Sequence, residues 1–160
     1  MKNCAMNDTF DKLDRKILQQ LQINCRQSTE HLGAIVGLSA TACQRRIKKL
    51  RDSGVIHSEV AILDAATLQS RLTVLVEIKF NKGGTVVIEG FKALMRDCPA
   101  VQQCYYLAGD VDFSVIISVA NIQEYELLTR SLFLNNPNIV KFSSRVSMDN
   151  VKTSLAIPLD

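Results

Sequence analysis

Five basic side chains gather between positions 40 and 52, in the stretch ATACQRRIKKLRD. Arginine and glutamine can form paired hydrogen bonds with guanine and adenine edges, and lysine neutralises phosphates. A merely solvated helix more often mixes acids with such bases, yet the stretch carries one acid, Asp52. The pattern therefore favours nucleic-acid recognition. The five basic residues are Arg45, Arg46, Lys48, Lys49 and Arg51.

Helical spacing would put Arg45, Lys48 and Lys49 on one outer face, and Arg46 and Arg51 would flank it. Cys43, Ile47 and Leu50 are four and three residues apart, so on a helix they share the opposite, buried face and hold the basic face rigid. We predict that this helix contacts DNA. The predicted contact residues are Ser39, Thr41, Gln44, Arg45, Arg46, Lys48 and Lys49.

Two further helices are needed to position this one. The first is predicted from Leu13, Ile17, Leu18 and Leu21, with Asp11 or Asp14 near its start. The second begins after Ser28, buries Leu32, Ile35 and Val36, and ends at Gly37. The third begins after Ser39 and ends before Gly54. Two short helices joined by a tight turn containing glycine make a helix-turn-helix.

Charge and composition separate the two halves of the 160-residue chain. Residues 1–58 carry a net charge of +5 and residues 59–160 a net charge of −2, which suits a basic polyanion-binding half joined to a mildly acidic half. No stretch resembles a signal peptide or a membrane span, so we expect a cytoplasmic protein without a membrane partner. Five scattered cysteines and two histidines predict no metal site and no cofactor.

The second half alternates strands and helices in the order βαββαβ. Strands are predicted at 73–80, 101–108, 111–119 and 139–149, and helices at 85–97 and 121–134. This order is that of the ferredoxin-like fold, in which both helices cover one face of an antiparallel sheet. The predicted buried residues are Val74, Val76, Ile78 and Phe80, then Val87, Phe91, Leu94 and Cys98, then Phe113, Val115, Ile117 and Val119.

The other face of the sheet is predicted to be too apolar to stay in water. Leu75, Cys104, Tyr106 and Ile116 are assigned to it, which indicates self-association. The fold class is thus α+β. We expect a helix-turn-helix, winged-helix-like domain at 1–56, a strand or linker at 57–71, and a ferredoxin-like effector-binding and oligomerisation domain at 72–160.

The run LDRKILQQLQINCRQSTEHLGAIVGLSATACQRRIKKLRDSGVI resembles the N-terminal domain of the Lrp/AsnC family of transcriptional regulators. The segment GDVDF, at 109–113, resembles the family's loop between the second and third strands, and the closing VKTSLAIPLD resembles its tail. Two departures are mild: Cys25 replaces a common glycine, and Ala40 with Thr41 stands where proline often opens the helix. The resemblance spans about residues 10–159.

The resemblance implies sequence-specific binding to double-stranded DNA, homodimers paired sheet to sheet, and further assembly, often into octamers. It also implies an amino-acid effector between dimers. The backbone around Gly109 would bind a carboxylate, Asp110 or Asp112 an α-ammonium group, and Tyr105, Leu107 and Ser144 would line a pocket suited to leucine or methionine. From the residues alone, a simple turn is the favoured explanation of GDVD, and it is the resemblance that adds ligand binding.

Two other functions remain open at this level. Sirohaem decarboxylases resemble this family in both halves. Such chemistry would be expected to use histidine and arginine side chains lining a pocket in the second half, and the sequence has no histidine after His57. An amino-acid-sensing module that does not bind DNA would leave the basic helix unexplained. We therefore expect a regulator and not an enzyme, with no catalytic residues.

Overall fold

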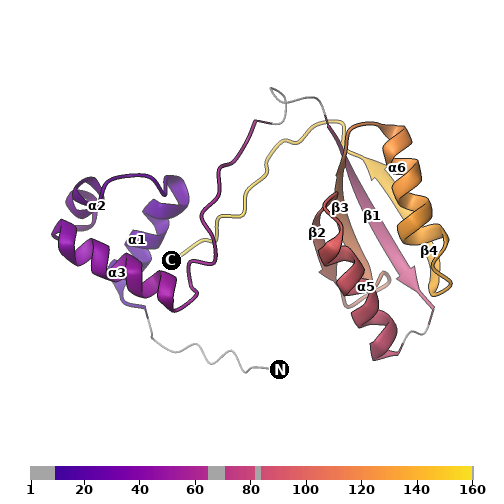
Figure 1. Ribbon diagram of the computed structural model, residues 1–160, viewed down its shortest axis with the longest axis horizontal. Helices are drawn as coiled ribbons and strands as arrows, with labels where there is room; N and C mark the ends of the chain where they lie inside the picture. The colour runs from indigo at the N-terminus through magenta and orange to yellow at the C-terminus, as the bar shows by residue number, and fades with distance from the viewer. Residues whose placement is uncertain (1–9, 65–70, 82–83, 160) are drawn as a thin grey trace. The chain divides into compact units, whose positions relative to one another are not determined.

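The computed structural model describes residues 10–64, 71–81 and 84–159 (Figure 1). The chain forms two compact units. The first contains the described residues up to Ile62 together with the C-terminal segment from Ser154, and the second runs from Leu63 to Thr153. In the described ranges, no helix has the length and apolar character that a membrane span requires.

Three helices form the first unit, and each begins at a residue that the sequence predicts. The side chains of Asp11, Ser28 and Ser39 accept hydrogen bonds from backbone N–H groups in the first turns. Gly37 ends the second helix with a left-handed φ of 79°. The helices are α1 (Lys12–Ile23), α2 (Thr29–Val36) and α3 (Ala40–Asp52).

The core of this unit is aliphatic and takes residues from all three helices. It consists of Ile17, Leu32, Val36, Cys43, Ile47 and Leu50. The prediction that Ile35 is buried is wrong, because its side chain is 47% exposed. Leu32 and Val36 lie one above the other on the core side, and the helical step turns their neighbour Ile35 towards solvent.

The turn between α2 and α3 closes tightly against Gly33. The backbone N–H groups of Gly37 and Leu38 both donate to the Gly33 carbonyl oxygen, each at 2.9 Å. A Cβ atom on Gly33 would lie 2.5 Å from the backbone carbonyl oxygen of Leu38. Because that neighbour is backbone and not a flexible side chain, the turn has room only for glycine.

Gly33→Ala is therefore expected to destabilise the protein by about 1–3 kcal/mol, since the turn must open to admit the methyl group. Urea unfolding of the full-length variant measures this free energy. Gly90→Ala is the matched control, because a Cβ at Gly90 in the second unit meets no atom within 4 Å. That change should be neutral or stabilising. Equal free energies of unfolding for the two variants would contradict the tight turn.

The second unit confirms the predicted ferredoxin-like fold. Its four strands form one antiparallel sheet in the order β2-β3-β1-β4, and both helices pack into one core on the same sheet face (Figure 1). The elements are β1 (Leu72–Phe80), α5 (Thr85–Asp97), β2 (Val101–Tyr106), β3 (Phe113–Val119), α6 (Ile122–Thr129), the π-helical turn η1 (Arg130–Leu134) and β4 (Ile139–Val146).

The inward faces of β1 and β3 are those predicted, whereas the buried stripe of α5 is displaced. α5 buries Ile88, Phe91 and Met95. Of the residues predicted for that stripe, Val87 and Cys98 only flank the core, and Leu94 is 40% exposed. Either stripe has helical spacing around Phe91, so periodicity alone did not distinguish them.

The open face of the sheet differs from the prediction in β2. An irregularity between Val101 and Gln103 shifts the register and so reverses which residues face the helices. Cys104 pairs with Val115 and Tyr106 with Phe113, both core residues. Placing Cys104 and Tyr106 on the open face was therefore wrong. Leu75 and Ile116 do share that face, together with Tyr105 and Gln103.

The segments that flank the second unit have no regular structure where they are described. Residues 57–64 form no strand, and the rest of the predicted strand or linker at 57–71 lies partly outside the described residues, at 65–70. The C-terminal segment packs with α1 and does not extend the sheet. Gln22 exchanges two hydrogen bonds with the backbone of Ile157, and Gln19 donates to the Leu159 carbonyl oxygen at 2.6 Å.

Candidate DNA-contact helix and effector loop

The outer face of α3 presents polar and basic side chains to solvent. Cys43, Ile47 and Leu50 are at most 6% exposed and fix the helix against α1 and α2. The residues predicted to point outwards are all exposed: Thr41, Gln44, Arg45, Lys48 and Lys49. The two faces of α3 are thus divided as its spacing predicts.

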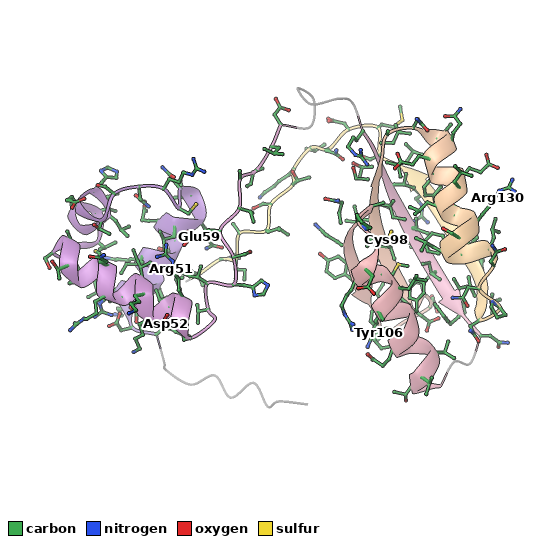
Figure 2. The ribbon with its side chains drawn as sticks, viewed as in Figure 1. Arg51, Asp52, Glu59, Cys98, Tyr106 and Arg130 are labelled. Carbon is green, nitrogen blue, oxygen red and sulfur yellow. The ribbon has the colours of Figure 1, made fainter. Side chains whose placement is uncertain are left out.

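The exposed basic side chains of α3 differ in whether they form ion pairs. Among the described residues, no ion pair involves Arg45, Lys48 or Lys49. Arg51, near the end of the helix, differs because its guanidinium donates to Glu59 Oε1 at 2.9 and 2.7 Å (Figure 2). The positive potential of this face is therefore concentrated on three side chains.

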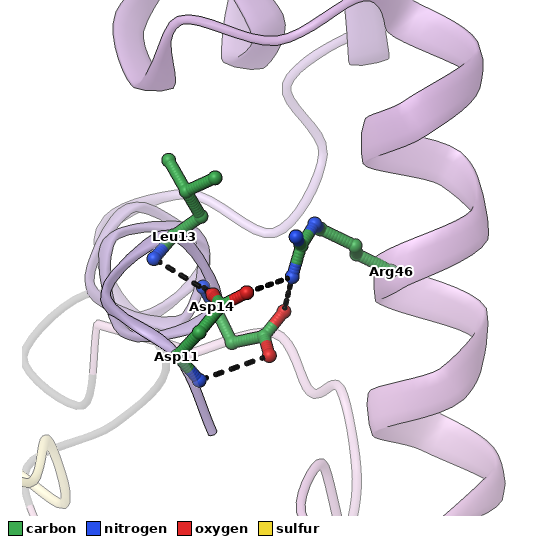
Figure 3. Close-up of polar contacts among 4 residues, drawn as sticks. All are labelled: Asp11, Leu13, Asp14 and Arg46. Carbon is green, nitrogen blue, oxygen red and sulfur yellow. Dashed lines mark hydrogen bonds and ion pairs between the residues drawn. The ribbon is translucent and has the colours of Figure 1, made fainter. Parts of the chain in front are cut away.

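Arg46 lies at the side of α3 and is engaged within the domain. Its Nη1 donates to Asp11 Oδ2 at 2.8 Å and to Asp14 Oδ1 at 2.7 Å (Figure 3). The hydrogen bonds to Asp14 and Asp11 raise the pKa of Arg46. The backbone N–H of Asp14, followed by the guanidinium of Arg46, lowers the pKa of Asp11. Sequence spacing had placed Arg46 beside the outer arc and did not anticipate these partners.

Ser39 stands at the amino end of α3. Its hydroxyl oxygen accepts a hydrogen bond from the backbone N–H of Ala42 at 3.2 Å, so its first role is to cap the helix. The exposed hydroxyl of Thr41 follows in the first turn. Both side chains lie where a helix amino end favours a phosphate, and their contact with DNA stays a prediction.

The GDVDF loop is a tight connection between β2 and β3. Gly109 has a φ of 150°, which favours glycine. Asp112 closes the loop: its N–H donates to the Ile78 carbonyl oxygen at 2.9 Å, and its Oδ2 accepts from the Phe80 N–H at 2.7 Å. The Leu107 N–H donates to the Asp112 carbonyl oxygen at 2.8 Å. Asp112 thus has a structural role that the sequence did not indicate.

The other predicted effector residues are only partly brought together within one chain. Tyr105, Leu107 and Asp110 are exposed in or beside the loop, and the Tyr105 hydroxyl donates to Gln103 Oε1 at 2.7 Å. Ser144 pairs with Val76, so it lies on the helix-facing side of the sheet, where its hydroxyl bonds that of Tyr125. Tyr105 pairs with Ser114 on the opposite face.

Each of the two units matches a known family of protein domains. The AsnC-type helix-turn-helix domain matches residues 10–51, and the Lrp/AsnC ligand binding domain matches residues 73–157. A leucine-responsive regulatory protein from Haemophilus influenzae is 36% identical over 146 residues, which cover 91% of this chain and 88% of that protein. An uncharacterized HTH-type transcriptional regulator of Sinorhizobium fredii is 37% identical over 151 residues, covering 94% and 89%.

Solved structures give the same result. An AsnC family transcriptional regulator from Agrobacterium tumefaciens superposes with a TM-score of 0.87 at 33% identity, covering 94% of this chain and 97% of that one. A transcriptional regulator from Neisseria meningitidis, in complex with L-methionine, superposes with a TM-score of 0.86 at 28% identity, covering 95% and 98%. Fold and site thus define a helix-turn-helix regulator with a ligand-binding domain. The chain belongs to the Lrp/AsnC family of transcriptional regulators.

Proposed function

We propose that this protein binds specific sites in double-stranded DNA through α3 and that a small amino acid modulates this binding. The observation that carries the proposal is the exposed face of α3, where Arg45, Lys48 and Lys49 have no acidic partner among the described residues. A rigid apolar core behind the helix lets that face enter the major groove as a unit.

The side chains of α3 divide by the contacts they can make. Gln44 and Arg45 have the paired donors and acceptors that read adenine and guanine edges. Lys48 and Lys49 supply point charges for phosphates, and Ser39 and Thr41 can bond phosphates at the helix start. A regulator of this kind works where the chromosome is, so we place the protein in the cytoplasm and propose no membrane partner.

The loop from Leu107 to Asp112 is proposed to hold the effector. Its exposed glycine backbone suits a carboxylate, and the exposed Asp110 suits an α-ammonium group. Asp112 is the weaker candidate of the two acids, because its carboxylate already accepts from the Phe80 N–H. Tyr105 and Leu107 favour a partly apolar side chain such as that of leucine or methionine. The relative crystallised with L-methionine supports this ligand class.

Assembly is proposed to use the open sheet face. Leu75 and Tyr105 are 40% and 51% exposed there, beside Ile116. Two such faces packed together would form a twofold dimer, and dimers would assemble further into an octamer. A twofold dimer presents two copies of α3 to half-sites about one helical turn apart, so the operator should be a pseudo-palindrome.

Catalysis is not part of this proposal. A decarboxylase on the same architecture would be expected to use histidines in the second half, and the sequence has none after His57. A sensing module that does not bind DNA is disfavoured by Arg45, Lys48 and Lys49, which form no ion pair within the described part of the chain. We therefore assign no catalytic residue.

Amino-acid binding is tested by calorimetry of the full-length protein with each of the twenty amino acids, followed by DNA-binding titrations with and without those that bind. We expect heat from leucine or methionine and a changed DNA affinity, because a ligand shifts assembly only through its differential affinity for the two states. Asp110→Asn should weaken ligand binding about tenfold, as expected for losing a charge-assisted hydrogen bond.

Asp97→Asn is the matched control, since Asp97 is an exposed acid of the same unit at the end of α5. It should bind the amino acid as the wild type does. If no amino acid gives binding heat while the protein still binds DNA, the loop is a simple turn and the effector proposal is wrong. Equal weakening by both variants would show that net charge alone, and not Asp110, matters.

A further inference from the structure

Two carboxylates at the start of α1, that of its N-cap residue Asp11 and that of Asp14, bind one guanidinium of α3. Arg46 Nη1 lies 2.8 Å from Asp11 Oδ2 and 2.7 Å from Asp14 Oδ1 (Figure 3). The Asp14 side chain is 9% exposed and that of Arg46 is 26% exposed. Shielding from water makes such a bridge more directional and less sensitive to salt than an exposed pair.

Both acids are held by the start of α1 before they meet Arg46. Asp11 Oδ1 accepts from the backbone N–H groups of Leu13 and Asp14, at 2.9 and 2.8 Å. Asp14 Oδ2 accepts from the Asp11 N–H at 3.3 Å. Each carboxylate therefore uses one oxygen to cap its own helix and the other to bind Arg46. The helix start is a fixed anchor for α3.

The position of Arg46 on α3 makes this anchor relevant to the outer face. Arg46 directly follows Arg45 and precedes Lys48 by two residues, while its neighbours Cys43, Ile47 and Leu50 are packed in the core. The apolar core holds the helix in place, but apolar packing is not directional. The two hydrogen bonds from Arg46 to anchored carboxylates add a directional restraint on the rotation of α3 about its axis.

We propose that Arg46 is a positioning residue of the DNA interface: it holds α3 against α1 so that Gln44 and Arg45 meet base edges, and it does not itself contact DNA. This inference rests on the proposed function. A phosphate contact by Arg46 would require it to leave two carboxylates, one of which would remain shielded from water without its partner. The two acids also make its surroundings negative, which disfavours an approaching phosphate.

The test compares full-length variants on two duplexes, one selected by the protein from a random library and one of scrambled sequence. Arg46→Met removes the ion pairs with both carboxylates. Arg46→Lys keeps the positive charge but replaces the planar guanidinium with an ammonium group. Asp14→Asn weakens the bridge without removing any positive charge. Arg51→Met is the matched control, since it removes the same charge from the same helix. The wild-type Arg51 pairs with Glu59 and not with α1.

We expect Arg46→Met and Asp14→Asn to reduce the ratio of specific to scrambled affinity roughly tenfold, as for the loss of a base contact. Arg46→Lys should lose less, and Arg51→Met should keep the ratio. The slope of log affinity against log salt should not change for Arg46→Met, because no phosphate contact is lost. Circular dichroism identifies the variants that fold. If Arg46→Met does not fold, Arg46→Lys takes its place in the comparison.

A different result separates the alternatives. If Arg46→Met weakens binding to both duplexes equally and lowers the salt slope by about one per subunit, while Asp14→Asn has no effect, Arg46 contacts phosphate and the positioning role is refuted. Folded Arg46 variants with the wild-type ratio would refute it as well. Wild-type protein that binds both duplexes equally would instead refute the proposed function.

Discussion

Replacing Arg45 and Lys48 together with alanine is expected to abolish most of the sequence-specific DNA binding of the protein. A bidentate arginine–guanine contact is worth about 1–3 kcal/mol at each half-site, and a twofold dimer loses it twice. Loss of Lys48 should also lower the salt slope by about one phosphate contact per subunit. Both side chains are exposed and form no described ion pair, so the fold should not change.

Fluorescence anisotropy with a labelled selected duplex, at several salt concentrations, measures both effects. The matched control replaces Lys16 and Arg26 with alanine, which removes the same charge from exposed positions of the same unit but not from α3. That protein should keep most of its specific affinity. If the two double variants bind the selected duplex equally well, then α3 is not the recognition helix.

Leu75→Asp is expected to convert the assembled protein into monomers. Leu75 lies on the open sheet face, directly opposite Ile116 in β3 and Arg145 in β4. Burying a carboxylate between two sheets costs several kcal/mol. In the free subunit the same carboxylate would be partly exposed and opposite Arg145, so the monomer should still fold.

Sedimentation velocity of the full-length variant at micromolar concentration measures this dissociation, and circular dichroism checks its fold. Val86→Asp is the matched control because Val86 is 87% exposed in the first turn of α5, away from the sheet face. It should assemble like the wild type. A folded Leu75→Asp protein of wild-type size would place the dimer contact elsewhere.

The parts of the fold that depend on local signals were predictable from the sequence. N-cap residues such as Asp11 and Ser39 satisfy backbone groups of their own helix, so a short segment is enough to reveal them. The two faces of α3 follow from the spacing of Cys43, Ile47 and Leu50. The inward residues of β1 and β3 follow in the same way from their period of two.

Features that depend on contacts between distant segments were not predictable. The irregularity in β2 reverses the faces of Cys104 and Tyr106, and no residue type near Val101 signals it. Arg46 and Asp14 are 32 residues apart, so their pairing needs the packed domain. An acid three residues after an N-cap residue indicates a capping box. The same pattern does not indicate that the second oxygen of that acid binds a side chain of another helix.

The role of Asp112 is also non-local. From the sequence, it was one of two acids of GDVDF available to an ammonium group. In the fold it caps the end of β1 through the Phe80 N–H, so Asp110 becomes the better probe of the effector. Ser144 was predicted to line the same pocket as Tyr105, but the register of β4 places the two on opposite faces of the sheet within one chain.

The most direct measurement is the affinity of the intact wild-type protein for its selected duplex relative to a scrambled duplex, at physiological salt. A sequence-specific regulator should prefer the selected duplex about a thousandfold or more. That preference should fall sharply in the Arg45 and Lys48 double variant. Equal affinities for the two duplexes would contradict sequence-specific recognition by α3.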